Sequence, residues 1–371
     1  MKLNIAVYHY NVLGLSETFI FRQLNGLSRY FNIKLLTREI QNTDEFPGLA
    51  PLLVPRRSFL STLLLQNKRN ENDFFSRHLK GSDLFHINFG TFAVLMQHHA
   101  KRLGIPMTAY FLGVDASEAL RDQSYCDELK KATFAAVFVN SQDMKRRLTP
   151  YLPHNMKCHV VYCGIPLERF PFTQRYAVPE GAQFLQVSRF EPKKGIDITI
   201  EAFSRYLKES DTTARLTIAG DGPLKSDLML LADTLGLGES ISFPGRVGYL
   251  KYIELLQAAD VLLHPSVTSP DGDMEGLPTA ICEAMACGLP VISTRHSGIP
   301  EIIEDGKDGF LVEERDVDGL FKRMASLRMA DIPELSRRAR MKIEDKFNHD
   351  KTITVLSEHM SRIISGEVRA R

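Results

Sequence analysis

The sequence predicts an α/β protein with two Rossmann-like halves, each built around a parallel β-sheet. Three observations support this prediction: short apolar segments alternate with longer amphipathic ones, the alternation starts again near residue 180, and a stretch rich in Pro and Gly separates the two runs. A chain of 371 residues can also bury two cores. The predicted domains are 1–165 and 170–349, and a closing helix at about 350–371 is expected to pack back on the first domain.

The elements of each half follow from their length and period. Strand-like apolar segments of the first half are 3–10, 32–38, 84–90, 107–113 and 135–141, with amphipathic stretches such as SETFIFRQLNGLSRY between them. Those of the second half are 182–190, 214–222, 240–247, 259–266, 289–297 and 308–314. Helical periods cover 195–209, 223–236, 248–258, 278–287 and 315–328. Because strands that alternate with helices pair in parallel, both sheets are expected to be parallel.

Composition and charge limit the function classes. Hydrophobic residues make up 44% and charged residues 25% of the chain, as in ordinary globular proteins. Five cysteines without paired spacing favour reduced thiols over a disulfide framework or a zinc site. No apolar run reaches the length of a membrane span, and the first residues do not resemble a signal peptide, so a cytoplasmic protein is expected. Residues 1–165 contain 20 Lys and Arg against 13 Asp and Glu, which predicts an anionic partner for this half.

Candidate site residues follow two strands of the second half, at the edge where open parallel sheets bind ligands. Arg189 and Lys194 come after the first of these strands, beside a helix start, and such a pair of cations suits a diphosphate. Glu275 lies in the loop after the fourth strand and Glu283 in the helix that follows, where each carboxylate could accept hydrogen bonds from sugar hydroxyls. A diphosphate flanked by two polyols describes a nucleotide sugar, whereas the alternative is a set of solvated strand and helix ends.

Several motifs in a fixed order carry a family resemblance. VSRFEPKKGID, TIAGDGP, ISFPGRV, AADVLLHPS and EGLPTAICEAMACGLPVISTRHSGIPEII resemble the carboxyl-terminal domain of glycosyltransferase family 4, which is marked by Glu, seven residues and Glu. LSETFIFRQLNGL, VNSQDMKRRL and VVYCGIPLERF are similar to members that build bacterial exopolysaccharide and lipopolysaccharide. The resemblance implies the GT-B fold, with two Rossmann-like β/α/β domains facing each other across a deep cleft.

The resemblance also implies a role for individual positions. The second domain would bind the nucleotide-sugar donor and the first domain the acceptor. Arg189, Lys194 and Glu275 are the implied catalytic residues, since the cations would stabilise the charge of the leaving diphosphate while Glu275 holds the transferred sugar. The other implied donor-binding residues are Gly14, Arg246, Val247, His264, Ser266, Gly276, Leu277, Thr279 and, at the ribose, Glu283. The implied acceptor-binding residues are Ser16, Glu17, His86 and Asp115.

By the same resemblance the protein is a retaining glycosyltransferase of the hexosyltransferase type that needs neither metal nor cofactor. The expected donor is a UDP-sugar, and the expected acceptor is a saccharide, lipid-linked, in bacterial surface polysaccharide biosynthesis. No nucleic acid is expected to bind, and the Asp-Gly-Asp at 271–273 is taken as a loop and not a metal motif. The basic segment 55–81 has apolar residues at helical spacing, so it either docks on an anionic membrane surface, at the inner face of the cytoplasmic membrane, or covers its own domain.

Departures from the family pattern leave alternatives open. Leu112 stands where many members have a histidine, although Gly113 and Asp115 are kept, and Asn88 stands where some have a second histidine. One alternative is a non-catalytic partner subunit that binds a nucleotide sugar without turnover. Another is a nucleotide-sugar epimerase or a phosphorylase of the same fold, although the phosphorylase would need a cofactor lysine that no motif indicates.

Overall fold

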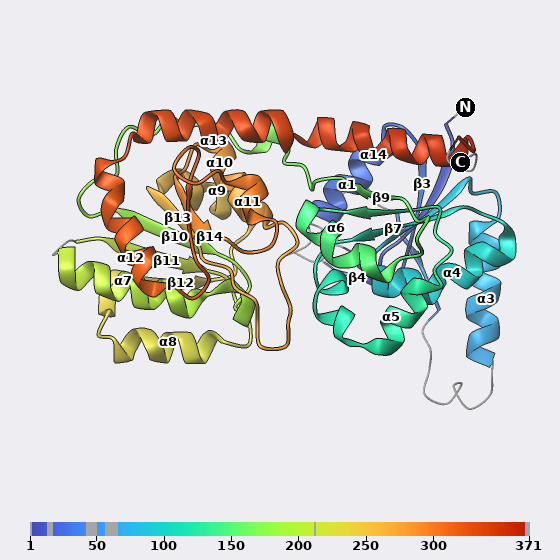
Figure 1. Cartoon of the computed structure of the whole chain (residues 1–371), viewed down its shortest axis with the longest axis horizontal. Coiled ribbons are helices and arrows are strands. Elements are labelled where there is room, and N and C mark those ends of the chain that lie inside the picture. The colour runs from blue at the N-terminus through green and yellow to red at the C-terminus, as the bar shows by residue number, and fades with distance from the viewer. Residues whose placement is uncertain (1, 13–17, 42–49, 56–65, 211–212, 368–371) are drawn as a thin grey trace. The chain divides into compact units, whose positions relative to one another are not determined.

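The chain folds into two compact units in a computed structural model that describes residues 2–12, 18–41, 50–55, 66–210 and 213–367 (Figure 1). One unit comprises Met1–Gly164 together with His349–Arg371, and the other comprises Ile165–Asn348. The sequence had predicted 1–165 with a returning C-terminal helix, and 170–349. Each unit has its own sheet and its own core.

The first unit contains a seven-stranded parallel sheet in the order β5-β3-β1-β6-β7-β8-β9. Its strands are β1 (Asn4–Tyr8), β3 (Asn32–Thr37), β5 (Leu52–Leu53), β6 (Leu84–Asn88), β7 (Met107–Phe111), β8 (Ala136–Val139) and β9 (Cys158–Val160). β2 (Asn11–Val12) pairs separately with β4 (Glu39–Ile40). The five predicted strands are present, whereas the short strands β2, β4, β5 and β9 were not predicted, because two or three residues carry too little periodicity.

Helices cover both faces of this sheet. Successive residues of β1 enter different clusters, Ile5 and Val7 on one face and Ala6 and Tyr8 on the other, as a period of two requires. The first cluster includes residues of α1 (Thr18–Ser28) and three residues of α14 (His349–Ile364), whereas the second includes residues of α3 (Gln66–Leu79) and α4 (Gly90–Leu103). The described part of the unit also contains α5 (Gln123–Lys130) and α6 (Gln142–Leu148).

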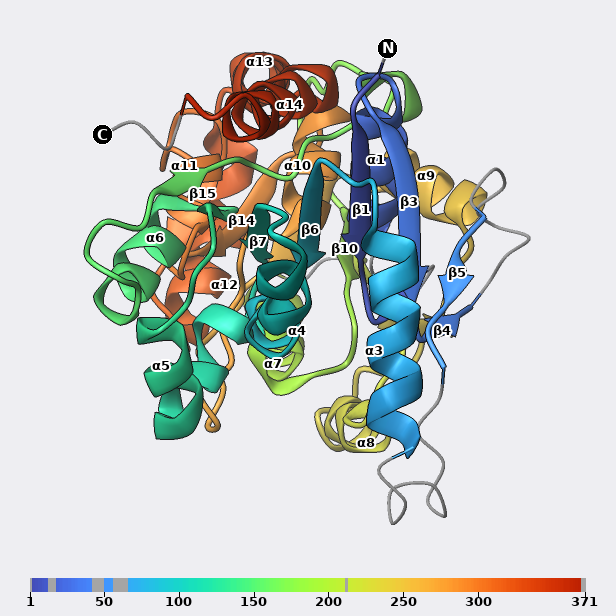
Figure 2. The same cartoon turned by 90° about the vertical axis from the view of Figure 1, so that its right-hand side faces the viewer.

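The described part of the basic segment packs on its own domain. Figure 2 shows α3 in front of the edge strands of the sheet. Phe75 and Leu79 of α3 are fully buried in the core, and Arg38 at the end of β3 forms a 2.8 Å ion pair with Glu71 of α3. Residues 56–65, which carry much of the predicted amphipathic pattern, lie outside the described ranges. Within those ranges no helix is long and apolar enough to span a membrane.

The second unit contains a six-stranded parallel sheet in the order β12-β11-β10-β13-β14-β15. Its strands are β10 (Gln183–Val187), β11 (Arg215–Ala219), β12 (Ile241–Gly245), β13 (Val261–His264), β14 (Val291–Thr294) and β15 (Phe310–Val312). Its helices are α7 (Ile196–Ser210), α8 (Lys225–Thr234), α9 (Tyr249–Ala258), α10 (Thr279–Ala286), α11 (Ile299–Ile302), α12 (Val317–Ser326) and α13 (Ile332–Lys346). All six predicted strands and five predicted helices are confirmed.

Both sheets have the doubly wound strand order. When the strands of each main sheet are numbered along the chain, their order across the sheet begins third, second, first, fourth, fifth, sixth. The direction of winding therefore reverses between β1 and β6 in the first sheet and between β10 and β13 in the second. The prediction of two Rossmann-like domains is therefore confirmed. Ligands of such folds bind outside the carboxyl ends of the strands at the reversal point, which in the second unit lies at the ends of β10 and β13.

Candidate active site

Two loops meet at the reversal point of the second unit. The chain leaves β10, passes Arg189 and makes a short 3-10 turn at Pro192–Lys194 before α7 begins. It leaves β13 at His264 and runs through a loop to α10 at Thr279. The N–H of Val267 donates to the carbonyl of Lys193 at 2.9 Å, so the two loops are joined through their backbones as well as their side chains.

Gly195 makes this close approach possible. Its φ is +56°, in the left-handed region that side chains other than glycine rarely adopt. A Cβ added at this position would stand 2.0 Å from the carbonyl oxygen of Pro265, which is backbone and cannot rotate away. The turn that carries Lys194 can therefore touch the β13 loop only because residue 195 lacks a side chain.

Replacing Gly195 with alanine is expected to lower the free energy of unfolding by about 1–3 kcal/mol, because the residue is then strained and displaces the Pro265 carbonyl. Urea titration with circular dichroism measures this effect. Gly236→Ala is the matched control, since Gly236 also has positive φ (+71°) but no atom within 4 Å of its added Cβ. Equal losses in the two variants would show that only the backbone angle matters and that the close approach does not.

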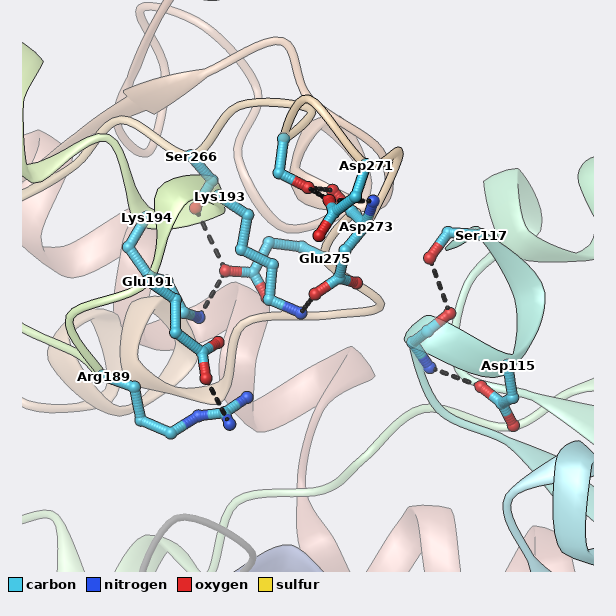
Figure 3. Close-up of polar contacts among 12 residues, drawn as sticks. Asp115, Ser117, Arg189, Glu191, Lys193, Lys194, Ser266, Asp271, Asp273 and Glu275 are labelled. Carbon is cyan, nitrogen blue, oxygen red and sulfur yellow. Dashed lines mark hydrogen bonds and ion pairs between the residues drawn. The ribbon is translucent and has the colours of Figure 1, made fainter. Parts of the chain in front are cut away.

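Two buried ion pairs fasten the turn to the loop (Figure 3). Lys194 Nζ binds Glu275 Oε1, and Lys193 Nζ lies 2.6 Å from Asp273 Oδ2. Glu275 is only 6% exposed, and its Oε1 also accepts a 3.2 Å hydrogen bond from Ser266 Oγ. His264 Nε2 is 3.8 Å from the same oxygen. The structure thus brings three predicted donor-site residues, Lys194, Ser266 and His264, together around the carboxylate of a fourth, Glu275.

The surroundings of Glu275 keep it ionised. Burial alone would raise the pKa of this carboxyl, but Lys194, His264 and Lys193 together hold the pKa well below its usual value. Burial lowers the pKa of His264, which therefore stays neutral at pH 7. A permanently charged carboxylate is a strong acceptor for sugar hydroxyls, and the three donors of an ammonium allow Lys194 to bind both Glu275 and a phosphate oxygen.

Arg189 and the start of α10 provide sites for an anion. The Arg189 side chain is 53% exposed and its Nη1 pairs with Glu191 Oε1 at 2.7 Å (Figure 3). The amide groups of Gly276, Leu277 and Thr279 lie at the start of α10, and the first turn of a helix has N–H groups without intrahelical partners. An accessible guanidinium and the free amides at a helix start are each suited to bind a phosphate group.

Three other predicted donor-site residues lie on elements further along the carboxyl edge of this sheet, namely Glu283, Arg246 and Val247. Glu283 is 5% exposed inside α10 and accepts a 2.7 Å hydrogen bond from the hydroxyl of Tyr252 in α9. Arg246 and Val247 connect β12 to α9, and Arg246 has a 70% exposed side chain whose Nε lies 3.9 Å from Asp221. Tyr252, which orients Glu283, was not identified from the sequence.

Two predicted site residues of the first unit are fully buried. His86 lies within β6, its Nδ1 is 2.9 Å from Thr108 Oγ1, and burial lowers its pKa to about 3. Such surroundings are typical of a core histidine with a partner. Asp115 (Figure 3) is also fully buried. Its carboxylate accepts the backbone N–H groups of Gly90, Leu112 and Gly113 at 2.7 to 3.0 Å.

Asp115 therefore positions the backbone at Gly90, Leu112 and Gly113, and no part of its side chain is exposed. Burial raises its pKa, although the three backbone donors oppose this shift. Leu112, which replaces the histidine common in the resembled family, is 7% exposed and reaches Asp115 through its backbone only. The predicted site residues Gly14, Ser16 and Glu17 lie outside the described residues.

Several residues at the site were missed by sequence reasoning. Lys193 and Asp273 form the second ion pair, and His296, Ser297 and Glu314 contact the loop that carries Glu275. The adjacent lysines in PKKG could have indicated the second pair. Asp271 of the Asp-Gly-Asp segment accepts a hydrogen bond from Ser269, and its neighbour Asp273 binds Lys193 (Figure 3). In the described part of the chain no three His, Cys, Asp or Glu side chains are grouped as metal ligands would be.

The chain is similar in sequence to polysaccharide-building enzymes. Residues 172–344 match the family model described as glycosyl transferases group 1. The "Putative colanic acid biosynthesis glycosyltransferase WcaL" of Escherichia coli (strain K12) is 41% identical over 195 residues, or 52% of this chain and 48% of that protein. The amylovoran biosynthesis glycosyltransferase AmsK of Erwinia amylovora is 37% identical over 209 residues, or 56% of this chain and 51% of that protein. The matches thus span about half the length of these relatives.

Solved structures share the fold at low sequence identity. HepE of Anabaena, solved with UDP and glucose, has a TM-score of 0.80 and 17% identity, over 97% of this chain and 99% of that one. The lipopolysaccharide outer core galactosyltransferase WaaB has a TM-score of 0.72 and 18% identity, over 98% of this chain and 100% of that one. Residues 172–344 thus match the glycosyl transferases group 1 model, and the two Rossmann-like units of the chain have the GT-B fold of these solved structures.

Proposed function

We propose that the protein is a retaining glycosyltransferase that moves a hexose from a UDP-sugar to a saccharide acceptor in bacterial exopolysaccharide biosynthesis. The observation that carries this proposal is the charged carboxylate of Glu275, buried at the reversal point between Lys194 and the start of α10. A site that joins a fixed acceptor group to the cations of Lys194 and Arg189 matches the two chemical parts of a nucleotide sugar.

Each part of the donor has a partner in the second unit. Arg189, Lys194 and the amides of Gly276, Leu277 and Thr279 bind the diphosphate, and Glu275 binds hydroxyls of the transferred sugar. Glu283, oriented by Tyr252, accepts from the ribose hydroxyls. The base lies against the backbone at Arg246 and Val247, and His264 and Ser266 line the wall beside the sugar.

The chemistry is an exchange at the anomeric carbon. The bond between this carbon and the phosphate oxygen breaks, the acceptor oxygen forms the new glycosidic bond on the same face, and the acceptor proton passes to the departing phosphate oxygen. Arg189 and Lys194 stabilise the negative charge that grows on the diphosphate. Glu275 acts as a hydrogen-bond acceptor, because its Oε1 is bound by Lys194 and Ser266. These fixed cations are suited to supply the charge compensation for which other transferases use a metal ion.

The choice of UDP and of a lipid-linked acceptor rests on similarity and charge. HepE and the pneumococcal O-GlcNAc transferase GtfA were solved with UDP. A mannosyltransferase of Mycolicibacterium smegmatis named as GDP-mannose-dependent is 34% identical over 163 residues, so GDP-sugars are the second donor class to test. The excess of Lys and Arg in residues 1–165 favours an anionic acceptor such as a lipid-linked diphosphate saccharide at the inner face of the cytoplasmic membrane.

The proposal is tested by screening UDP- and GDP-sugars for binding by calorimetry while nucleoside diphosphate release is followed in the same samples. One donor is expected to bind and to release its nucleoside diphosphate slowly, and Glu275→Ala is expected to lower this release by about 10²-fold or more. Glu239→Ala, at an exposed position after α8, is the control and should behave as wild type. Binding without release would instead identify a non-catalytic subunit, and no binding by any donor would overturn the proposal.

A further inference from the structure

The backbone of Glu275 is held by side chains that follow another strand. His296 Nε2 accepts the N–H of Glu275 at 3.0 Å, and Ser297 Oγ donates to the Glu275 carbonyl at 2.6 Å. His296 and Ser297 lie in the loop after β14, which pairs with β13 in the sheet. Two consecutive side chains thus bind both backbone polar groups of Glu275, the residue that carries the central carboxylate.

The other end of the same loop is held in the same manner. Glu314 accepts the N–H of Thr268 at 2.8 Å, and Arg315 donates to the Thr268 carbonyl at 2.6 Å. Glu314 and Arg315 follow β15, the next strand of the sheet. The loop from Thr268 to Glu275 is therefore clamped at each end by a pair of consecutive residues.

Both clamps use an uncommon backbone conformation. Ser297 has φ of 47° and Arg315 has φ of 62°, in the left-handed region that residues other than glycine, asparagine and aspartate seldom occupy. Such residues persist where the surrounding contacts determine them, and they concentrate at functional sites. Ser297 and Arg315 are the second residues of the two clamps, so their uncommon backbone conformation points to selection for the geometry of the Glu275 loop.

A hydrogen bond between His296 and Glu314 joins the two clamps. His296 is fully buried and its Nδ1 lies 2.6 Å from Glu314 Oε1. Because the carboxylate can only accept, the proton of the imidazole is assigned to Nδ1, and Nε2 is left with the lone pair that accepts the Glu275 N–H. A second proton on the ring would sit on Nε2 and face that N–H.

We propose that His296 and Glu314 are positioning residues that keep the Glu275 loop in its active geometry only while His296 is neutral, an inference that rests on the proposed function. Protonation of Nε2 replaces an acceptor with a donor, breaks the bond to the Glu275 N–H and releases one end of the loop. Turnover then falls on the acid side of neutrality while the protein stays folded.

The charged and titratable groups around His296 are consistent with this assignment. They are Glu314 and Arg315 after β15, His264 at the end of β13, and the Glu275 and Lys194 pair. Burial would raise the pKa of Glu314, but the N–H of Thr268 and the His296 ring hold it below its usual value, and the pKa of Glu275 is lower still. Both carboxylates thus stay charged in mild acid.

The kinetic test compares the pH profile of donor turnover in wild type, His296→Gln and Glu314→Gln. Wild type is expected to lose turnover by about tenfold or more between pH 7.5 and pH 5.5, in kcat more than in KM, because a displaced Glu275 misaligns the sugar. His296→Gln should lose this acid limb, since an amide oxygen accepts the Glu275 N–H at every pH. Glu314→Gln should shift the limb to lower pH by about one unit or more, because the neutral amide no longer stabilises the imidazolium.

A second measurement needs no turnover. Backbone amide hydrogen exchange of peptides covering 268–275 is expected to rise by about tenfold or more from pH 7.5 to pH 5.5 in wild type, after correction for the intrinsic pH dependence, and to stay constant in His296→Gln. His154→Gln, at an exposed histidine, is the control and should follow wild type. If hydrogen exchange of residues 268–275 in wild type does not depend on pH, the proposed roles of His296 and Glu314 are overturned even if the enzyme is active. If this exchange depends on pH but no donor is turned over, only the proposed function is overturned.

Discussion

Lys194→Met is expected to lower the free energy of unfolding by about 3–5 kcal/mol, because it leaves the buried Glu275 carboxylate without its counter-ion. Both side chains are at most 12% exposed, so water cannot replace the lost partner. The same change is expected to reduce donor turnover by about 10²- to 10³-fold, since it removes the cation that we propose to stabilise the leaving diphosphate.

A double-mutant cycle separates the two effects. Adding Glu275→Gln to Lys194→Met should restore most of the lost stability, since the uncompensated charge is removed, but should restore no turnover. Lys225→Met is the matched control, because Lys225 pairs with Asp221 at 3.8 Å with both side chains about 40% exposed, and it should cost less than about 1 kcal/mol. If the double variant is no more stable than Lys194→Met, the ion pair is not the source of the loss.

Asp115→Ala is expected to lower the free energy of unfolding by about 3 kcal/mol or more. Asp115 supplies the N-terminal cap of α4 from a distant segment, since its carboxylate accepts the Gly90 N–H while the adjoining Phe89 offers no side-chain cap. It also binds the N–H groups of Leu112 and Gly113, and each buried donor left without a partner costs about 1–3 kcal/mol. Urea unfolding measures the loss, and hydrogen exchange of α4 should increase with it.

Asp122→Ala is the control for this prediction. Asp122 is an exposed residue that caps α5 by accepting the N–H of Ser124 at 2.8 Å, so its loss should cost only about 1 kcal/mol. A loss for Asp115→Ala no larger than this would contradict the positioning role. Retained stability with a specific defect in acceptor binding would instead support the direct contact that the sequence had suggested.

The recognition of the site from sequence depended on local patterns. Arg189 and Lys194 could be placed at a strand end because the apolar run stops at residue 190, and Glu275 could be placed before a helix because the 278–287 segment has a helical period. The observed ends of β10 and the start of α10 agree with this placement. The pattern could not show that Lys194 and Glu275 bind each other, because they are 81 positions apart and meet only through the pairing of β10 with β13.

The sequence alone determined that two parallel sheets form and that charged side chains gather at strand ends, because helix and strand periods and the placement of Gly and Pro are local properties of the chain. Only the tertiary structure decided which of these side chains act together. His296 reaches Glu275 because β14 lies beside β13, and His86 and Asp115 are buried because neighbouring strands and helices enclose them. Burial and partner choice depend on the order of strands in the sheet, and no local pattern encodes that order.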